Sequence, residues 1–363
     1  NRIMSVGKVH VLFLAEELRT GGAETYFYKL EELIDRNLIS FHSAGVPSGN
    51  EERLCFPELF VPYSFSIWDR IRVVGKYVCS HDVDIVHANS LQLCFAAAAA
   101  RRIVHKPFKI VYTKHNLTRL EKLAPATLTA FVNRYVDALV AICETDERVL
   151  ADRGVRGDLL FRINNGVDLN SFPFALRFPL EKNAKLRIGI LARLSSEKRH
   201  DLFLEFAKEF HGLFPNSAFY IGGDGPNFNS IKNYVNSNLM NEYVTMTGRV
   251  DAASFLSGID VLTLLSDREV MPMSILEGMA SGCAVIARSV GGMRDVVRPE
   301  TGVLVEGDCP SDYARSLIAA YFAHEFEQKT KRARKLIEKD YSLDKALRKH
   351  EELYIRLAQS AGE

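Results

Sequence analysis

The amino-acid sequence predicts two doubly wound α/β domains, each built around a parallel sheet. Short apolar runs recur along the 363 residues, and each is followed by a stretch in which apolar side chains have helical spacing. Strands that alternate with helices in this way form parallel βαβ units. The rhythm stops once in the middle of the chain and then restarts, and the length is sufficient for two buried cores. Two domains are therefore expected.

The first half contains four of these apolar runs. The predicted strands are VHVLFL (9–14), DIVHA (84–88), FKIVYT (108–113) and DALVAIC (137–143). Each has the length of a strand and is bounded by polar sequence or by a helical pattern. We assign residues 1–168 to an N-terminal domain.

The second half repeats the pattern after an irregular linker. Gly166, Pro173 and Pro179 interrupt any regular element there, and we place a hinge at residues 168–183. The next predicted strands are LRIGIL (186–191), SAFYIGG (217–223), DVLTLL (260–265), CAVIA (283–287) and GVLV (302–305). Residues 169–341 are assigned to a C-terminal domain.

The charged C-terminal tail is predicted to be helical over residues 322–357, with a break near residues 340–342. We expect the final helix, about residues 342–363, to pack back on the N-terminal domain. The sequence shows no internal repeat and no low-complexity segment.

The composition excludes several classes of protein. Lys and Arg total 46 against 45 Asp and Glu, so no overall field attracts nucleic acid. The six cysteines include no CxxC pair, which is typical of free thiols in a reducing cytosol. No run reaches the ~18 to 20 apolar residues of a membrane-spanning helix, and no signal peptide is expected. We expect a cytoplasmic protein.

The segment LARLSSEKRHD (191–201) directly follows the first predicted strand of the second domain. Ligands of parallel sheets bind at the carboxyl ends of strands. Arg193 is predicted at the strand end and Lys198 in the first turn of the next helix, which Ser195 or Ser196 would cap. Two cations beside a helix N-terminus form a pyrophosphate site. The alternative is a solvated helix start with scattered charge, but the position after the strand favours a functional site.

The segment DREVMPMSILEGMASG (267–282) carries Glu269 and Glu277, eight residues apart. Glu269 is predicted in a loop after a strand, and Glu277 about one turn into a helix over residues 274–281. A carboxylate that accepts from paired hydroxyls is suited to a sugar or a ribose. For an isolated pair with this spacing, a capping residue and a surface charge are the alternative.

Five motifs in this order resemble the donor domain of the GT-B retaining glycosyltransferases of family 4. Over residues 186–308 they are RLSSEK, GGDGP (222–226), GRV (248–250), the E-x7-E pair, and SVGGMRDVV followed by TGVLVEGD. The N-terminal half is similar to the family through GGAE (21–24), VHA (86–88) and TKHN (113–116). The resemblance implies two Rossmann-like domains that face each other across a cleft, with the acceptor on the N-terminal domain.

The resemblance also implies roles for the matching residues. Arg193 and Lys198 would hold the donor diphosphate and neutralise charge on the leaving group. Glu269 would accept from hydroxyls of the transferred sugar, Glu277 would accept from the ribose, and His115 would lie beside the anomeric carbon. The implied catalytic set is His115, Arg193, Lys198 and Glu269, and the implied donor-binding set is Gly21, Gly22, Gly223, Arg249, Val250, Met271, Pro272, Met273, Ser274 and Glu277.

The implied reaction moves a sugar from a nucleotide-diphosphate donor with retention of its anomeric configuration, without a metal or another cofactor. Uridine is expected as the base, with guanosine as the alternative. The acceptor would be a glycan, a lipid-linked sugar or a small molecule, in polysaccharide or glycoconjugate biosynthesis of the cell envelope. Val270 stands where many family members have glycine, so the transferred sugar is left open.

Three other functions and two other sites are also compatible with parts of the sequence. A nucleotide-sugar epimerase, a glycoside hydrolase and a non-enzymatic sugar-binding module each explain part of the pattern. His87 ends a predicted buried strand, so a structural role in the core and a functional role are equally compatible with the sequence. Asp82 and Asp84 form a D-x-D sequence at the amino end of a strand, the wrong end for a metal site.

The acceptor side is the least defined. Residues 55–68 are rich in aromatic side chains and residues 117–135 are amphipathic, so either segment could contact an acceptor or a membrane surface. Basic residues near the second segment favour a lipid-linked acceptor. They are Arg101, Arg102, Lys106, Lys109 and Lys114. Ordinary core packing with solvated charge is the alternative.

Overall fold

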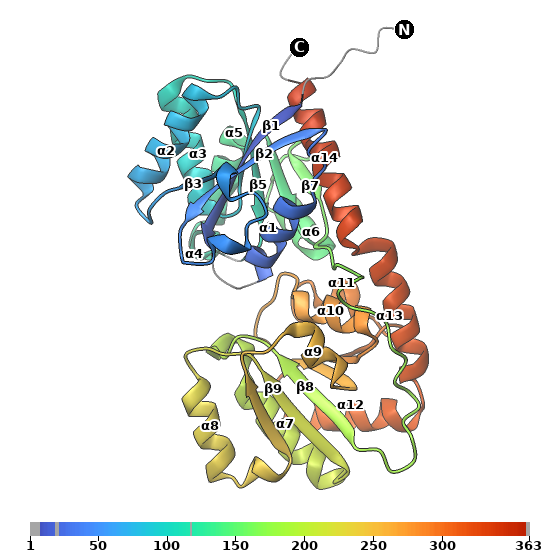
Figure 1. Cartoon of the computed structure of the whole chain (residues 1–363). Helices are drawn as coiled ribbons and strands as arrows, with labels where there is room; N and C mark the ends of the chain where they lie inside the picture. The colour runs from blue at the N-terminus through green and yellow to red at the C-terminus, as the bar shows by residue number, and fades with distance from the viewer. Residues whose placement is uncertain (1–7, 19–21, 117, 361–363) are drawn as a thin grey trace, which may run out of the picture. The chain divides into compact units, whose positions relative to one another are not determined.

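The chain folds into two compact units. The computed structural model describes residues 8–18, 22–116 and 118–360. One unit comprises Asn1–Gly166 together with Asp344–Glu363, and the other comprises Val167–Leu343. Each unit contains one parallel sheet with helices on both faces (Figure 1). The predicted class of two doubly wound, Rossmann-like α/β domains is thereby confirmed.

The first unit has a seven-stranded sheet in the order β3-β2-β1-β4-β5-β6-β7, in which every neighbouring pair is parallel. Its strands are β1 (Val9–Glu17), β2 (Ile39–Val46), β3 (Phe60–Pro62), β4 (Ile85–Ala88), β5 (Lys109–Lys114), β6 (Ala138–Ala141) and β7 (Leu160–Arg162). The strand order reverses direction between β1 and β4. In open sheets such a switch point is where ligands bind.

Helices cover both faces of this sheet. They are α1 (Gly22–Leu33), α2 (Ile67–Ser80), α3 (Leu91–Val104), α4 (Arg119–Leu123), α5 (Pro125–Tyr135) and α6 (Glu144–Asp152). Leu12, Val86 and Ile110 point to the face where α2, α3 and α5 complete one core. Successive residues of a strand face opposite sides, so Phe13 points to the other face, where its ring stacks on Phe27 of α1 at 5.2 Å.

The last helix, α14 (Leu343–Gln359), belongs to the first unit, although the whole second unit separates it in sequence from the rest of that unit. His350 Nδ1 lies 3.2 Å from the Tyr26 hydroxyl. The Glu351 carboxylate accepts from the backbone N–H of Asp35 at 2.8 Å. The helix before it, α13 (Phe326–Asp340), ends where the tail was predicted to break.

The second unit has a six-stranded parallel sheet in the order β10-β9-β8-β11-β12-β13. Its strands are β8 (Leu186–Leu191), β9 (Ser217–Gly222), β10 (Val244–Gly248), β11 (Val261–Leu264), β12 (Ala284–Arg288) and β13 (Val303–Val305). The order again reverses at its centre, between β8 and β11. Residues 163–185 before β8 contain no helix or extended strand, as expected for a linker.

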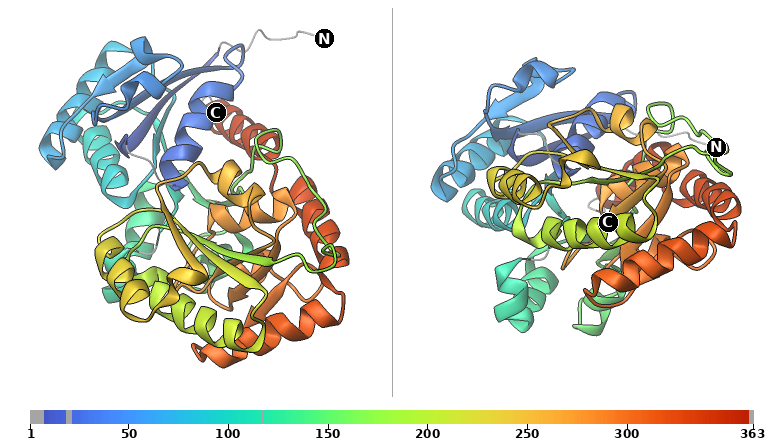
Figure 2. Two further views of the ribbon diagram at one scale, coloured as in Figure 1. Left: turned by 60° about the horizontal axis from the view of Figure 1, so that its bottom comes forward. Right: turned by 90° about the horizontal axis from the view of Figure 1, so that it is seen from below.

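Two groups of helices cover this second sheet. The first group is α7 (His200–Leu213), α8 (Phe228–Ser237) and α12 (Pro310–Phe322). Figure 2 shows α12 beside α7, and the rings of Phe206 and Tyr313 meet between them at 6.4 Å. The second group is α9 (Ala252–Ser257), α10 (Met273–Ser281) and α13, with the short α11 (Met293–Val296) between β12 and β13.

Close backbone packing seats α10 on the sheet. A Cβ atom on Gly278 would lie 2.4 Å from the Leu262 side chain of β11, so this helix approaches its strand more closely than a larger residue permits. The N-terminus of α10 is thereby fixed near the carboxyl ends of the central strands. Within the described ranges, none of the helices combines the length and the apolar character that crossing a bilayer requires.

Candidate functional site

Loops that follow the strands of the second sheet form one continuous rim at its carboxyl edge. The loop after β8 is bonded to the loop after β9, which is bonded in turn to the end of β10. A further bond joins the β8 loop to the loop after β11. The bonds are Ala192 N–H to Gly222 O at 3.1 Å, Leu194 N–H to Asp224 O at 3.0 Å, Gly223 N–H to Gly248 O at 2.8 Å and Asp267 N–H to Glu197 O at 2.9 Å.

Glycines permit the closest of these approaches. Gly223 has a φ of +128°, and an added Cβ would lie 2.1 Å from the carbonyl oxygen of Ala192. Gly291, after β12, has a φ of +48°, and its Cβ would lie 1.8 Å from the carbonyl oxygen of Glu269. Both positions therefore require glycine for loop packing alone. The packing also brings the SVGG segment against the loop that carries Glu269.

Lys198 and Glu269 meet directly in this rim. The Lys198 Nζ lies 2.5 Å from Glu269 Oε1, and both side chains are largely buried. An ammonium group has three donors and a carboxylate has two oxygens. The pair therefore leaves two donors on Lys198 and one oxygen on Glu269 to bind a ligand, and it holds both side chains in place.

The predicted cap before this helix is wrong. Residues Ser196–Lys198 form a separate 3₁₀ turn, and α7 begins only at His200 with Arg199 as its N-cap. Neither serine caps the helix, and the Ser195 hydroxyl instead donates to Glu197 at 2.7 Å. The left-handed backbone of Arg199, with a φ of 53°, separates the turn from the helix. Lys198 consequently lies in the turn rather than in the first turn of α7.

The N-terminus of α10 follows Glu269 by four residues. Pro272 is the N-cap and makes no capping bond through its side chain. The first N–H groups of a helix lack partners within the helix, so those of Met273 and Ser274 are available to an anion. Met271 and Pro272 are buried, which anchors the start of the helix.

Glu277 lies on α10, one turn from that N-terminus, as predicted. Burial, followed by the negative charge of Asp251, raises the pKa of Glu277 to about 7. The side chain is half-buried, and the backbone carbonyl of Glu277 accepts from the Ser281 hydroxyl at 2.8 Å. Asp251 directly follows Gly248, Arg249 and Val250, and its negative charge is the second cause of the raised pKa of Glu277.

The remaining predicted donor residues lie on the same rim with less contact. Arg193 is exposed after β8, and no side chain among the residues that the structure describes pairs with it. Arg249 is exposed and Val250 half-buried after β10. Lys198 and Glu269 are the one pair in direct contact among the four central predicted residues, all of which the structure describes. Arg193 and Glu277 lie at the same carboxyl edge of the sheet without contacting that pair.

A network of charged residues beside this pair was not predicted. Arg199 lies 3.0 Å from Asp267 and 3.4 Å from Asp308, while Arg288 lies 2.5 Å from Asp267. It joins the loops after β8 and β11 to the end of β12 and the loop after β13. Each of these residues ends a strand or follows one, and that position is the sequence signal that could have identified them.

His115 lies after β5 in the first unit, where the loops after β4 and β5 meet. Its Nε2 is 2.6 Å from Asn89 Oδ1. Because the amide oxygen only accepts, this contact places the ring proton on Nε2 and leaves Nδ1 as an acceptor. Burial, followed by the neighbouring His350 imidazole, lowers the pKa of His115 to about 4. The ring is therefore neutral at pH 7. Asn89 was not predicted, although it follows β4 directly.

His87 is a core histidine. Its Nδ1 lies 2.6 Å from the Tyr354 hydroxyl and its Nε2 lies 2.7 Å from Thr113 Oγ1. Both ring nitrogens are therefore occupied within the fold, and the side chain is almost completely buried. The structure thus decides between the two interpretations in favour of packing.

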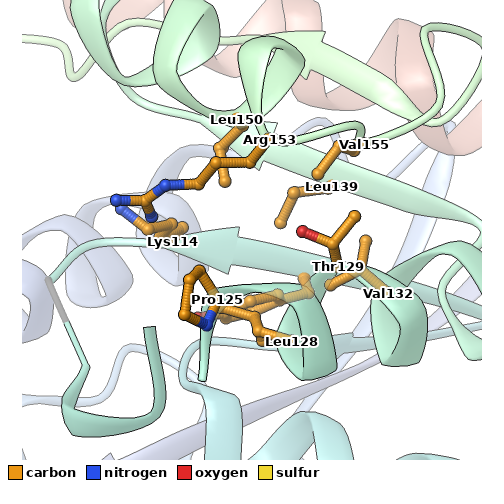
Figure 3. Close-up of a pocket in the computed structure, with 10 residues that line it drawn as sticks. Lys114, Pro125, Leu128, Thr129, Val132, Leu139, Leu150, Arg153 and Val155 are labelled. Atoms are coloured by element: carbon orange, nitrogen blue, oxygen red, sulfur yellow. The ribbon is translucent and has the colours of Figure 1, made fainter. Parts of the chain in front are cut away.

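Lys114 is not a surface cation, so its place in the predicted basic patch is wrong. Its Nζ lies 2.6 Å from Asp146 and 3.3 Å from Glu121, and only 1% of its side chain is exposed. Figure 3 shows Lys114 and Arg153 at the polar end of a cavity with otherwise mainly apolar walls. The cavity measures about 10 Å³, enough for about one water but not for a sugar.

Two more members of the basic patch have acidic partners. Arg101 Nη1 lies 2.6 Å from Asp137, and Lys109 lies 3.9 Å from the same carboxylate. Basic side chains that pair within the fold contribute little to attracting an anionic surface. These ion pairs weaken the prediction of a lipid-linked acceptor, because that prediction depended on these basic residues.

Other predicted positions have less structural detail. Gly21 lies outside the described residues, and Gly22 begins α1. Asp84 precedes β4 at its amino end, where its carboxylate accepts from the His10 N–H at 2.8 Å. Among the residues that the structure places, no three His, Cys, Asp or Glu side chains gather as a metal site.

Comparison with known proteins identifies the family. Residues 185–321 match the model of glycosyl transferases group 1, and residues 8–171 match that of glycosyltransferase family 4. Two similar proteins of Escherichia coli have glycosyltransferase names. The UDP-Gal:alpha-D-GlcNAc-diphosphoundecaprenol alpha-1,3-galactosyltransferase is 27% identical over 77% of each chain. The O-antigen biosynthesis glycosyltransferase WbnH is 22% identical over 82% of this chain and 86% of its own.

A solved structure supports the same fold. Anabaena Alr3699/HepE in complex with UDP and glucose superposes with a TM-score of 0.79 at 19% identity, over 94% of this chain and 98% of its own. The family models cover both units, and the named relatives transfer sugars. The chain therefore belongs to the GT-B glycosyltransferases of group 1 and family 4.

Proposed function

We propose that this glycosyltransferase moves a sugar from a UDP-linked donor to a lipid-linked or glycan acceptor, with retention of the anomeric configuration and without a metal. The Lys198–Glu269 pair carries the proposal, because it sets an ammonium group, which is suited to a phosphate, 2.5 Å from a carboxylate, which is suited to sugar hydroxyls. The uridine base is supported by the UDP-Gal donor in the name of one relative and by the UDP bound to a structural neighbour.

The proposed donor site uses the groups that the rim leaves available. Lys198 and the exposed Arg193 supply positive charge, and the first N–H groups of α10 add their dipoles. Glu277 accepts from the ribose hydroxyls, for which a carboxylate on the first turns of α10 is suited. Glu269 keeps one oxygen for the transferred sugar.

The proposed reaction proceeds on one face of the donor sugar. The bond between the anomeric carbon and the phosphate oxygen breaks while the acceptor oxygen attacks from the same side. The acceptor proton passes to the departing phosphate, so no enzyme nucleophile is required. Lys198 and Arg193 stabilise the negative charge that develops on the diphosphate, which is where fixed charges lower a barrier most.

Loss of Lys198 tests the core of the proposal. In Lys198→Ala we expect kcat to fall by about 10²- to 10³-fold, the effect of removing one preorganised group from a developing charge. Lys232→Ala is the matched control, because Lys232 is an exposed lysine of the same unit outside the rim. Activity in Lys198→Ala equal to that of the control would refute the assigned role.

The donor and the stereochemistry need a direct assay. The protein is incubated with UDP- and GDP-sugars, with and without N-acetylglucosamine-diphosphoundecaprenol as acceptor, and the released nucleotide is measured. We expect UDP release that depends on acceptor, insensitivity to EDTA, and an α-linked product by NMR. An epimerase would convert the donor without acceptor, and an inverted product would exclude retention.

An exposed apolar surface supports a lipid-linked acceptor better than the basic residues do. Phe65 is 62% exposed and Trp68 is 75% exposed at the start of α2. Lys76 follows Trp68 by eight residues, so the two lie on one face of the helix, whereas Arg72 on the same face already pairs with Asp69 at 2.7 Å. Aromatic side chains with adjacent cations are typical of a segment that lies in a membrane interface.

Vesicle flotation tests this surface. We expect the protein to float with vesicles that contain phosphatidylglycerol, and the Phe65→Ala/Trp68→Ala variant to remain in solution. Leu38→Ala removes an exposed side chain of the same unit outside both candidate segments and serves as control. If wild type and the double variant partition equally, α2 is not the contact.

A further inference from the structure

The second unit has a surface pocket beside the rim that carries the proposed donor residues. It measures about 560 Å³, within the roughly 300–1,000 Å³ of small-molecule sites. It opens between α7 and α8, which lie side by side on one face of the sheet (Figure 1). None of Arg193, Lys198, Glu269 or Glu277 lines it.

The pocket has an apolar side and a polar side. Leu204 of α7 and Ile231 of α8 are buried beneath it, and the Tyr234 ring stands beside them. The Tyr234 hydroxyl donates to Glu205, which fixes the ring. On the other side, Asn227 Nδ2 donates to Ser196 Oγ at 3.3 Å. An apolar surface that faces planar polar groups is suited to a sugar ring, which has C–H faces and hydroxyl edges.

The charges around the pocket select against anions. Asp201, Glu205 and Asp267 line it together with Arg199 as the one lining cation. Arg199 already pairs with Asp201 and Asp267. Three carboxylates against one guanidinium repel a phosphate group, whereas they accept hydrogen bonds from neutral hydroxyls.

His200 is the second, independent indication of a ligand. The residue lines the pocket and is only 3% exposed, and neither ring nitrogen has a hydrogen-bond partner among the residues that the structure describes. Burial lowers the pKa of His200 to about 4, so the ring is neutral at pH 7, with one donor and one acceptor. Buried polar groups without partners are costly, and they are uncommon unless a ligand or water binds them.

We infer that this pocket is a second carbohydrate-binding site, which holds a neutral sugar ring between the Tyr234 face and the Asn227, Ser196 and His200 side chains. The inference rests on the pocket alone and does not require the proposed donor site. A glycosyltransferase with such a site could retain a glycan while the donor site exchanges its nucleotide.

Saturation-transfer NMR on the full chain tests the site. N-acetyl-D-glucosamine and D-galactose are the neutral probes, and inorganic phosphate and spermidine are charged competitors. UDP is added in excess to fill the proposed donor site. We expect at least one sugar to bind with millimolar affinity in the presence of UDP, without displacement by either competitor. Absence of sugar binding, or displacement by phosphate, would overturn the inference.

Two substitutions assign the binding to this pocket. Ser230→Trp fills the pocket from an exposed position of α8, and Lys232→Trp places the same ring on that helix outside the pocket. We expect sugar binding to fall at least tenfold in the first variant only; equal binding in both overturns the assignment. His200→Leu should lose binding while its melting temperature stays at or above that of wild type, whereas retained binding would contradict a role for His200. Failure of the donor proposal alone would leave all three results unchanged.

Discussion

Glu277 should make the free protein less stable as the pH rises. Its pKa is about 7 in the folded chain, against an ordinary value of 4.5. Below about pH 4.5 the carboxyl is protonated in both states. Between pH 4.5 and 7 the unfolded chain ionises while the folded chain keeps the proton, so the free energy of unfolding falls. A difference of about 2.5 pKa units at about 1.4 kcal/mol per unit gives a loss of about 3.5 kcal/mol once both states are ionised.

Glu277→Gln removes this titration. We take the difference in unfolding free energy between the variant and wild type at each pH. This difference should be up to about 3 kcal/mol more in favour of the variant at pH 8 than at pH 5. The cost of burying the amide is the same at both pH values, so it cancels in this comparison. Urea unfolding at the two pH values measures the effect, and the exposed Glu300→Gln is the control.

The same substitution should act in the opposite direction on nucleotide binding. A charged hydrogen-bond acceptor is worth about 1.5–3 kcal/mol, so UDP affinity in Glu277→Gln should fall by about 10- to 100-fold by calorimetry. A variant that is more stable at high pH but binds UDP more weakly would indicate that Glu277 serves ligand binding rather than folding. The reasoning fails if the variant has the pH dependence of wild type, or if it binds UDP equally well.

Three further substitutions follow from the contacts. Gly223→Ala should lower the free energy of unfolding, measured with urea, by at least about 2 kcal/mol. The control Gly49→Ala, also at positive φ but with open space around the added Cβ, should lower it by about 1 kcal/mol. Similar losses in the two variants would contradict the clash between residue 223 and Ala192. Lys114→Met leaves Asp146 buried without its cation, whereas Glu121 keeps Arg153 at 2.5 Å, and the loss of the Asp146 pair should cost about 3–5 kcal/mol. Lys109→Met at a half-buried pair should cost less than about 1 kcal/mol, and an equal loss would show that Lys114 is solvated. Val270→Gly should broaden the range of donor sugars in kcat/KM, and an unchanged preference would remove Val270 from the sugar site.

The central strands could be predicted from the sequence because they are buried on both faces. LRIGIL corresponds to β8 residue for residue, and the other predicted runs overlap the observed strands. The strands that were not predicted have weaker patterns. His42 and Ser43 interrupt the apolar run of β2, and β10 at the sheet edge alternates buried Val244 with exposed Thr245. An edge strand buries less of its surface, so its composition carries less signal.

The sequence predicted that the site residues lie at the carboxyl edge of the sheet, but it did not predict which of them contact each other. Glu269 and Lys198 were each placed after a strand, and parallel strands bring their carboxyl ends to one edge. Their 2.5 Å contact depends on β8 and β11 being neighbours, which spacing along the chain does not reveal. Lys114 shows the opposite limit. Its partner Asp146 is 32 residues away, so from sequence it had the appearance of a surface cation.

Hydrogen-bond partners within the fold separate structural from functional polar residues in this chain. His87 and Lys114 are buried and bonded to neighbouring side chains, so their removal should cost stability. His200 is buried and its ring nitrogens have no partner in the described chain, and the half-buried Glu277 carboxylate has a raised pKa, so removal of either side chain should cost binding instead. Lys198 combines both properties, because one donor is held by Glu269 and two remain. For that reason Lys198→Ala should lower activity far more than it lowers the free energy of unfolding, and a loss of both in proportion would make Lys198 a structural residue.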